Sequence, residues 1–443
     1  MNKRTLIKDI YDFFIKFIST DEYKKLRIIY LIAFISSIII FTLGPQEDGG
    51  DTISYYYAAK KIITGSFDFM RTPLYPIFLI ITLNSRFTII LQYLIFFVSI
   101  TYLYKTLETG KISPRLIFIT MIIYVCHPVF IYYQNQRIPE ALCISLCSIF
   151  VYYSVKFIKN EKTLDCWMSH LIILFMILLK PGCIFLLSVP VILLLYLFFV
   201  KRKLILSHII PSLFVFIIIG SYAFSLKKTY DVFSISSVSD INLYWMLRER
   251  DQVNVNLIED DDVKNYVSGK INIKYEKFVN YIYEGYEIIN KYGWKELHTI
   301  VQGSLKENYK SFYWSKSNIE TIRKNLYGYV GKSFELFTPR NKILDNFSNS
   351  SLFLFNFYQL ILILFFYFIL IVIQIYKTRN IPIISILFLS CILIHIFTLI
   401  MTAPNNYGRL IVASLPIILI VCTQCFERIV LFIRKDENKF ELV

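Results

Sequence analysis

The segment 48–79 carries the residue types that could do chemistry in this chain. An acidic, glycine-flanked loop comes first, a short amphipathic helix follows, and an Arg then precedes two prolines and a Tyr. The segment directly follows the first apolar run, which would place a carboxylate and a guanidinium where a membrane ends and water begins. Such a pair suits a substrate that has an apolar tail and a charged head.

Asp51 is the leading carboxylate, because it immediately precedes a helix-like run that Gly65 would end. A carboxylate at this boundary could act as a general base toward a hydroxyl within hydrogen-bond reach. The alternative is that Asp51 caps the helix, since Asp is favoured at such a position on its own, and the two roles are compatible. Glu47 and Asp48 are the alternative carboxylates, although a solvated loop charge is the simpler interpretation of each.

Arg71 opens the sequence Arg-Thr-Pro-Leu-Tyr-Pro, whose prolines stiffen the entry into the next apolar stretch. An Arg side chain can bind phosphate through two parallel hydrogen bonds. The alternative is an interfacial anchor that extends its charge to water. Three further cations, Arg137, Lys180 and Arg409, are predicted on the same face, with Glu140 close to Arg137 in one turn. Together these cations would suit an anionic lipid headgroup.

Composition predicts how these residues are positioned. Hydrophobic residues make up 56% of the 443, and the mean hydropathy is +0.54. Apolar runs of about membrane-spanning length recur, so we expect an all-α polytopic membrane protein with about ten transmembrane helices. The first run lacks a small-residue cleavage site and indicates a retained anchor. The ten runs are 28–43, 87–104, 116–133, 139–155, 167–179, 182–200, 204–224, 352–375, 381–401 and 410–426.

The formal net charge of +15 has an uneven distribution along the chain. If both termini are cytoplasmic, Lys and Arg concentrate in the short segments on the cytoplasmic side, which is the positive-inside bias of membrane proteins. The basicity therefore indicates membrane topology rather than nucleic-acid binding. We expect a multi-pass protein of the cell (inner) membrane with the Asp51 loop on the external, periplasmic side.

The same topology predicts five regions. They are a cytoplasmic amphipathic N-terminus (1–27), a transmembrane domain (28–224) with its first external loop at 44–86, a mostly helical external lobe (225–350), C-terminal transmembrane helices (351–433) and a cytoplasmic tail (434–443). The eight Cys lie mostly in apolar runs, where we expect small hydrophobes and no disulfide framework. His127 and His395 are expected to pack at helix interfaces.

Several short motifs occur in a fixed order along the chain. They are Asp51-x-x-x-Tyr55-x-x-x-Ala59, Gly65, Arg71-x-Pro73-x-Tyr75-Pro76, Phe78-Leu79, Gln92, Pro139-Glu140-Ala-Leu, Leu179-Lys180-Pro181 and Tyr407-x-Arg409-Leu with Pro416. This series resembles the C-fold (GT-C) membrane glycosyltransferases, in the bacterial branch near the protein O-mannosyltransferases and the lipid A aminoarabinose transferases. The similarity extends from residue 27 to about 420, and the external lobe matches least.

The resemblance implies a polytopic transferase that uses a polyprenyl-phosphate-linked sugar on the outer side of the membrane. It assigns the catalytic carboxylate to Asp51 and a donor-phosphate contact to Arg71. We therefore expect an inverting transfer in which Asp51 deprotonates an acceptor hydroxyl. Arg71, helped by Arg137, Lys180 or Arg409, would stabilise the leaving lipid phosphate.

Tyr55, Tyr75 and Glu140 complete the expected substrate-binding set. Two features depart from the family pattern: Lys180 stands where relatives often have Arg, and the paired acidic motif of some members is absent at Asp51-Thr52. We therefore expect no tightly bound metal or other cofactor, with a divalent metal as the disfavoured alternative. The expected partners are the lipid-linked donor, a glycan, lipid or protein acceptor, and the bilayer, but no nucleic acid.

Three other functions fit part of the pattern. A lipid-linked-oligosaccharide polymerase or ligase fits the topology but matches the first-loop motif less well. A flippase or transporter of lipid-linked sugars would place ionisable residues at mid-depth, whereas here they are predicted mainly at one face. A non-catalytic scaffold would have no need of the pair Asp51 and Arg71. A nucleotide-sugar donor is disfavoured, because no predicted cytoplasmic segment is long enough for a nucleotide-binding domain.

Overall fold

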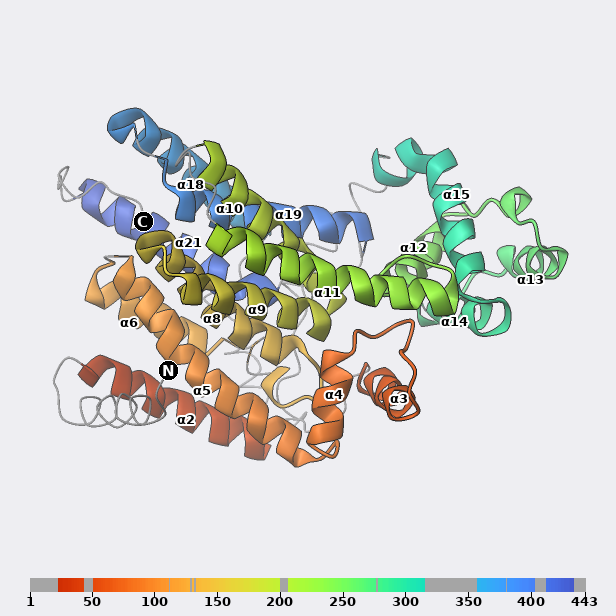
Figure 1. Ribbon diagram of the computed structural model, residues 1–443, viewed down its shortest axis with the longest axis horizontal. Coiled ribbons are helices and arrows are strands. Elements are labelled where there is room, and N and C mark those ends of the chain that lie inside the picture. Colours follow the sequence, from red (N-terminus) through yellow and green to blue (C-terminus); the bar gives the residue numbers. More distant parts are fainter. Residues whose placement is uncertain are drawn as a thin grey trace.

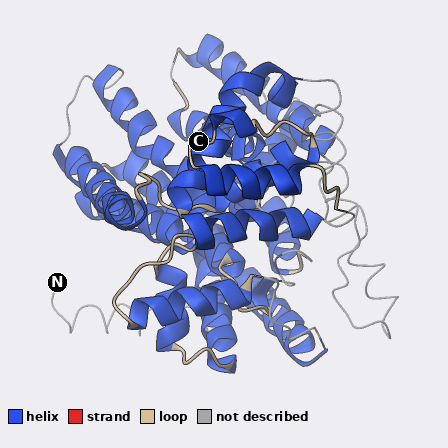
Figure 2. Cartoon of the chain, turned by 90° about the vertical axis from the view of Figure 1, so that its right-hand side faces the viewer, coloured by secondary structure: helices blue, strands red, loops and turns tan. Residues whose placement is uncertain are grey.

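The chain folds into helices, as the apolar runs predict. The computed structural model describes residues 23–43, 51–110, 112–127, 130, 133–199, 206–275, 278–314, 357–379, 381–402 and 412–433, and these contain helices and no strand (Figure 2). Each of the ten predicted apolar runs contains part of a helix. The all-α class is therefore confirmed.

The apolar helices form a bundle that occupies the left and centre of Figure 1. Its members are α2 (Lys24–Leu43), α5 (Arg86–Thr109), α6 (Pro114–Val125), α8 (Glu140–Asn160), α9 (Thr163–Leu179), the 3-10 helix η2 (Pro181–Leu187) with α10 (Ser188–Phe199), α11 (Leu206–Tyr230), α18 (Phe357–Thr378), α19 (Ile383–Thr402) and α21 (Leu415–Ile433), with the short η4 (Val412–Ser414) before it. Two short helices, α3 (Thr52–Ile63) and α4 (Leu74–Ile81), lie at the end of the bundle that faces the lobe.

Six helical segments in the described residues are long and apolar enough to cross a membrane. They are Lys24–Thr42, Arg86–Thr109, Glu140–Asn160, Pro181–Phe199, Ser207–Tyr230 and Gln359–Thr378. Three more apolar helices are shorter, and the shortest of them, α6, spans only about 18 Å at the usual rise per residue. These features are those of a helical membrane protein, while the predicted number of about ten spans is not confirmed.

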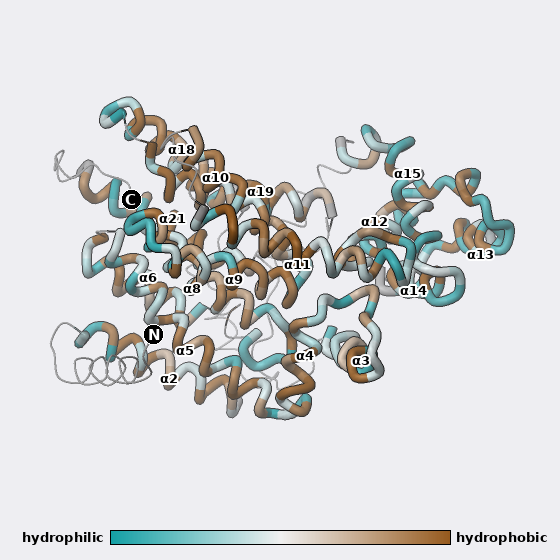
Figure 3. Tube along the Cα trace, viewed as in Figure 1, coloured by the Kyte–Doolittle hydropathy of each residue, from teal (hydrophilic) through white to brown (hydrophobic). Residues whose placement is uncertain are grey.

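Helix α8 is the centre of the bundle. It packs against α5, α9 and α21, and 67% of its most apolar window is buried, compared with 22% for α2 at the periphery. Helices α2, α5, α11 and α18 expose large apolar side chains, which suits contact with lipid. Figure 3 shows that hydrophobic residues predominate along these helices. Inside the bundle, polar side chains pair with one another, as where Tyr124 bonds both Ser99 and Ser148.

A polar helical lobe extends from the end of α11, at the right of Figures 1 and 3. It contains α12 (Val238–Glu249), η3 (Val255–Leu257), α13 (Asp261–Ile271), α14 (Phe278–Tyr292) and α15 (Trp294–Trp314). A buried ion pair joins α12 to α14, with Arg248 Nε 2.8 Å from Glu284 Oε1. Asp240 of α12 accepts a hydrogen bond from the Trp294 indole at 2.7 Å, which fixes α15.

The segment that leaves α11 is tied to the loop between α3 and α4. The Tyr230 hydroxyl donates to the Phe67 carbonyl (2.8 Å), the Ser237 amide to the Phe69 carbonyl (2.8 Å) and the Ser236 hydroxyl to the Met70 carbonyl (2.6 Å). These bonds set the lobe directly over the first predicted external loop.

Gly65 ends α3, as the sequence predicts. Its φ of +82° is in the left-handed region, where glycine carries no steric penalty from a Cβ. The Gly65 amide donates to the Ile62 carbonyl and the Ser66 amide to the Lys61 carbonyl, which is the Schellman pattern of helix termination.

Several predicted features lie outside the described residues. They are the amphipathic segment before residue 23, the alternative carboxylates Glu47 and Asp48, the last part of the lobe (315–350), the predicted phosphate contact Arg409 and the tail 434–443.

Candidate active site

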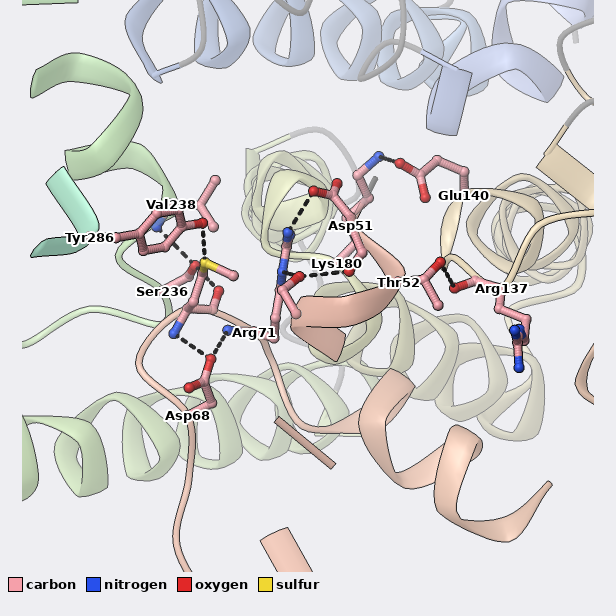
Figure 4. A network of polar contacts seen from close by, with 12 residues as sticks. Asp51, Thr52, Asp68, Arg71, Arg137, Glu140, Lys180, Ser236, Val238 and Tyr286 are labelled. Carbon is pink, nitrogen blue, oxygen red and sulfur yellow. Dashed lines mark hydrogen bonds and ion pairs between the residues drawn. The ribbon is translucent and has the colours of Figure 1, made fainter. Parts of the chain in front are cut away.

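Asp51 sits at the first position before α3, where the sequence allows either a cap or a catalytic carboxylate. Its side chain makes no capping hydrogen bond to the helix. Instead, Asp51 Oδ1 lies 2.8 Å from Arg71 Nη2, so the carboxylate forms an ion pair with the other leading residue of the same loop (Figure 4). The Asp51 side chain is 30% exposed, which leaves the carboxylate accessible from the adjoining cavity.

The first turn of α3 holds the Arg71 guanidinium in one orientation. Besides the Asp51 contact, Arg71 Nε donates to the Ser54 hydroxyl at 2.9 Å. The Tyr55 ring lies against the guanidinium, 4.5 Å from its carbon atom, in a cation–π arrangement. The Arg71 side chain is only 9% exposed, so contacts with the protein rather than with bulk water fix the position of its guanidinium.

Asp68, which the sequence analysis did not single out, fixes the backbone that carries Arg71. Its Oδ2 accepts hydrogen bonds from the amides of Met70 (3.0 Å) and Arg71 (3.1 Å). Its Oδ1 bonds Lys61 Nζ at 2.9 Å. Burial by itself would lower the pKa of Lys61, but the hydrogen bond and charge of Asp68 outweigh it and leave that pKa raised. The three-residue spacing from Asp68 to Arg71, typical of a side chain that closes a turn, could have indicated this role.

Lys180 reaches the same cavity from the end of α9. The chain leaves the helix here, because Lys180 is extended and Pro181 starts η2. Its ammonium lies 3.1 Å from Glu140 Oε1 at the start of α8, and both side chains are buried. This contact holds the Lys180 side chain in place at the wall of the cavity. Glu140 thus holds a cavity-lining cation.

A cavity of about 300 Å³ brings Asp51, Arg71 and Lys180 together with the lobe. The bundle with its first loop supplies one part of the lining and the lobe the other, and each part contains both polar and apolar side chains. The lobe contributes the hydroxyl and amide side chains of Ser234, Ser236, Ser239 and Asn242. The lining residues are Asp51, Tyr55, Arg71, Lys180, Pro181, Gly182, Ile184, Ser234, Ile235, Ser236, Val238, Ser239, Ile241, Asn242, Ile282, Tyr286, Thr398 and Leu399.

Tyr286 of α14 covers the cavity from the lobe side (Figure 4). Its hydroxyl donates to Met70 Sδ at 2.5 Å, next to Arg71 in the chain. Burial raises the pKa of Tyr286 to about 12, with the nearby Arg71 opposing that shift and Asp51 and Asp68 adding to it. Tyr286 therefore stays protonated at neutral pH and acts as a hydrogen-bond donor. It belongs to the part of the chain that matches the family pattern least, so the motifs gave no signal for it.

Arg137, predicted to bind phosphate, does not line this cavity. Its Nη1 donates to the Asn84 carbonyl at 2.5 Å, and Figure 4 shows the guanidinium pointing away from Asp51. Its carbonyl accepts the Thr52 hydroxyl at 3.1 Å, which anchors the start of α3 to the turn before α8. Arg137 is thus placed to position α3.

Tyr55 and Tyr75, predicted to bind substrate, occupy different layers. Tyr55 lines the cavity, whereas Tyr75 is fully buried behind it, with the two rings 5.0 Å apart and edge to face. The Tyr75 hydroxyl donates to Gln92, whose amide in turn donates to the carbonyls of Gln134 and Gln136. Tyr75 therefore packs behind the Tyr55 ring, which contacts the Arg71 guanidinium.

His127 and His395 are both buried, as expected for helix-interface residues. The His395 ring stacks on Phe185 with 3.9 Å between centroids, and its Nδ1 lies 2.5 Å from the Ser414 hydroxyl.

No family model, curated protein or solved structure matches this chain.

Proposed function

We propose that this chain is a glycosyltransferase that moves a sugar from a polyprenyl-phosphate-linked donor to an acceptor hydroxyl at the external face of the membrane. The observation that carries the proposal is the convergence of Asp51, Arg71 and Lys180 on one cavity between an apolar bundle and a polar lobe. A membrane-embedded tail and a charged, hydroxyl-rich head would be accommodated on the two sides of that boundary.

The two cations suit the phosphate of the donor. Arg71 and Lys180 come from separate elements, and each is held by a carboxylate, Asp51 and Glu140 respectively. The donor phosphate would compete with Asp51 for the Arg71 guanidinium, because both are oxyanions that bind the same N–H groups. Phosphate binding would then release Asp51 from its ion pair at the moment when a base is needed.

The released carboxylate is suited to the proton transfer. Asp51 would accept the proton of the acceptor hydroxyl while that oxygen attacks the anomeric carbon from the side opposite the phosphate. The bond between the anomeric carbon and the phosphate oxygen breaks, and its electron pair leaves with the lipid phosphate. Arg71 and Lys180 would stabilise the negative charge that develops there, and the configuration at the anomeric carbon inverts.

The lobe supplies groups that suit a sugar or acceptor. Ser239 and Asn242 can donate and accept hydrogen bonds, as sugar hydroxyls require, whereas the Ser236 hydroxyl already donates to the Met70 carbonyl. Tyr286 adds a protonated phenol beside Arg71. We propose that these residues orient the reacting groups, while the bundle residues perform the chemistry.

Deletion of the gene and its restoration test this function directly. We expect the deletion to remove one sugar from a surface glycan, lipid or protein and to raise the level of the corresponding lipid-linked sugar, as measured by mass spectrometry. The restored wild-type chain should reverse both changes. Unchanged surface glycans together with unchanged lipid-linked sugars would contradict the proposal.

The predicted orientation can be tested by cysteine labelling. Ser66 and Thr299 are exposed at the lobe end, and Lys162 is exposed at the opposite end of the bundle. We expect Ser66→Cys and Thr299→Cys to react with a membrane-impermeant maleimide in intact cells, and Lys162→Cys to react only after permeabilisation. The native cysteines give low background, since all but Cys126 are buried. If the Thr299→Cys variant were labelled only after permeabilisation, the lobe would be cytoplasmic and the predicted orientation would be wrong.

A further inference from the structure

A second group of reactive side chains lies at the other end of the bundle from the cavity. Cys166 and His170 are four residues apart on α9, and His208 lies near the start of the neighbouring helix α11. All three side chains are buried, with exposed fractions of 0%, 1% and 0%. Their potential metal-ligand atoms lie within 4.8 Å of one another, and no other such group of three occurs in the described part of the chain.

The distances within the cluster match a tetrahedral zinc site. Cys166 Sγ lies 3.6 Å from His170 Nδ1 and 3.7 Å from His208 Nδ1. Zinc binds thiolate sulfur at about 2.3 Å and imidazole nitrogen at about 2.0–2.1 Å, which at a tetrahedral angle separates sulfur from nitrogen by about 3.6 Å. Both sulfur–nitrogen distances therefore agree with a shared ion without rearrangement of the helices.

The outer nitrogens of both histidines are placed as in metal sites. His208 Nε2 lies 3.0 Å from the Pro190 carbonyl, which can only accept a hydrogen bond, so this nitrogen carries the proton and Nδ1 presents its lone pair toward Cys166. His170 Nε2 lies 3.1 Å from the Ser212 hydroxyl, which donates its own proton to the His208 carbonyl at 2.7 Å. Such partners on the far nitrogen orient metal-ligating histidines and fix their tautomer.

We propose that Cys166, His170 and His208 bind one Zn²⁺ ion that fastens α9 to α11. A thiolate with two imidazoles is a donor set that zinc favours, and three protein ligands leave a fourth position for water. The proposal departs from the expectation of no tightly bound metal, and it does not rest on the proposed transferase function. The ion would lie roughly 20 Å along α9 from Lys180, so its role is to hold the helices and not to take part in transfer.

The competing arrangement is a metal-free hydrogen-bond network. His170 Nδ1 also lies 2.9 Å from the Cys166 carbonyl, and a protonated Nδ1 would donate to that oxygen. In that tautomer His170 offers no lone pair to an ion beside Cys166. The two arrangements differ in the zinc content expected for the purified chain: one ion in the first and none in the second.

The test is the zinc content of the full-length chain, purified in detergent without a polyhistidine tag. We expect inductively coupled plasma mass spectrometry to find about one Zn²⁺ per wild-type chain. In Cys166→Ser and in His208→Asn we expect only background zinc. The matched controls are Cys391→Ser and His395→Asn, since this pair has the same four-residue spacing on α19 and is equally buried. These controls should keep the wild-type zinc content.

A second measurement covers the case in which the variants fail to fold. Wild-type chain exchanged with Co²⁺ should show the visible bands of a tetrahedral ion together with a thiolate-to-metal charge-transfer band. Background zinc and no cobalt bands in the folded wild-type chain would overturn the proposal. Zinc that persists in folded Cys166→Ser would also overturn it, because it would show adventitious binding only.

Discussion

Replacing Asp51 with Asn should lower sugar transfer by at least ~10²-fold, the loss typical of removing a general base. This corresponds to about 2.7 kcal/mol of lost transition-state stabilisation. Asn is close to Asp in shape and caps helices about as well, so a capping role alone would leave activity nearly unchanged. The measurement is turnover of a lipid-linked sugar by purified protein, alongside recovery of the surface glycan in cells.

The control for this variant is Asp260→Asn. Asp260 is also an Asp at a helix N-cap, but it lies in the lobe and its side chain accepts hydrogen bonds from the amides of Asp262 and Val263. Its replacement should leave transfer at the wild-type level, which would show that exchanging Asp for Asn at a helix N-cap does not by itself lower activity.

A folding defect must be separated from a catalytic one, because Asp51→Asn also removes the partner of the nearly buried Arg71. Size-exclusion profiles in detergent check this point. Asp51→Glu keeps the negative charge but moves the carboxylate by one methylene, so it should preserve the ion pair and still lose activity. Normal transfer by well-folded Asp51→Asn would remove Asp51 from the mechanism and leave Asp48 and Glu47 as the carboxylates to test.

Replacing Arg71 with Lys should reduce transfer by about 10²-fold even though the charge is kept. Lys offers a single ammonium and cannot reproduce the two-nitrogen contact that Arg71 makes with Asp51 and Ser54, nor the stacking on Tyr55. It would hold the donor phosphate less well in both the ground state and the transition state. The measurement is kcat and KM for the lipid-linked donor, and we expect the KM to rise as well as the kcat to fall.

Arg137→Lys is the matched control for the Arg71 variant. Both arginines were predicted as phosphate contacts on the same face, but Arg137 bonds Asn84 outside the cavity. The control should change transfer by less than Arg71→Lys does. An equal or larger loss with Arg137→Lys, in protein of normal stability, would mean that the phosphate binds elsewhere than beside Asp51.

The helices and the first-loop residues could be predicted from the sequence because the signals for them are local. Apolar runs predicted the helical segments, and Gly65 predicted the end of α3 from its own backbone preference. Asp51 and Arg71 were singled out from residue type and position. The contact between them was not predicted, and the structure places Asp51 Oδ1 2.8 Å from Arg71 Nη2.

The sequence was less informative where a residue's role depends on where its side chain points. Arg137 and Lys180 were both predicted as external cations, yet of the two only Lys180 lines the cavity. Lys180 forms an ion pair with Glu140 beside the cavity, whereas Arg137 donates a hydrogen bond to the Asn84 carbonyl outside it. Tyr55 and Tyr75 were likewise predicted alike, and only packing decided which of them faces the cavity. The number of spans also stayed open, since length and hydropathy do not establish that a short apolar helix crosses the membrane.

By itself, therefore, the sequence determined the helical class, the apolar character of the bundle and a carboxylate and guanidinium in its first loop. Tertiary structure alone decided which distant groups join them. Lys180, Ser236 and Tyr286 reach the cavity from three other elements, and His208 reaches Cys166 and His170 from another helix. The physical reason is that helix formation depends on neighbours a few residues apart, whereas a site depends on side chains that packing brings together across long stretches of chain.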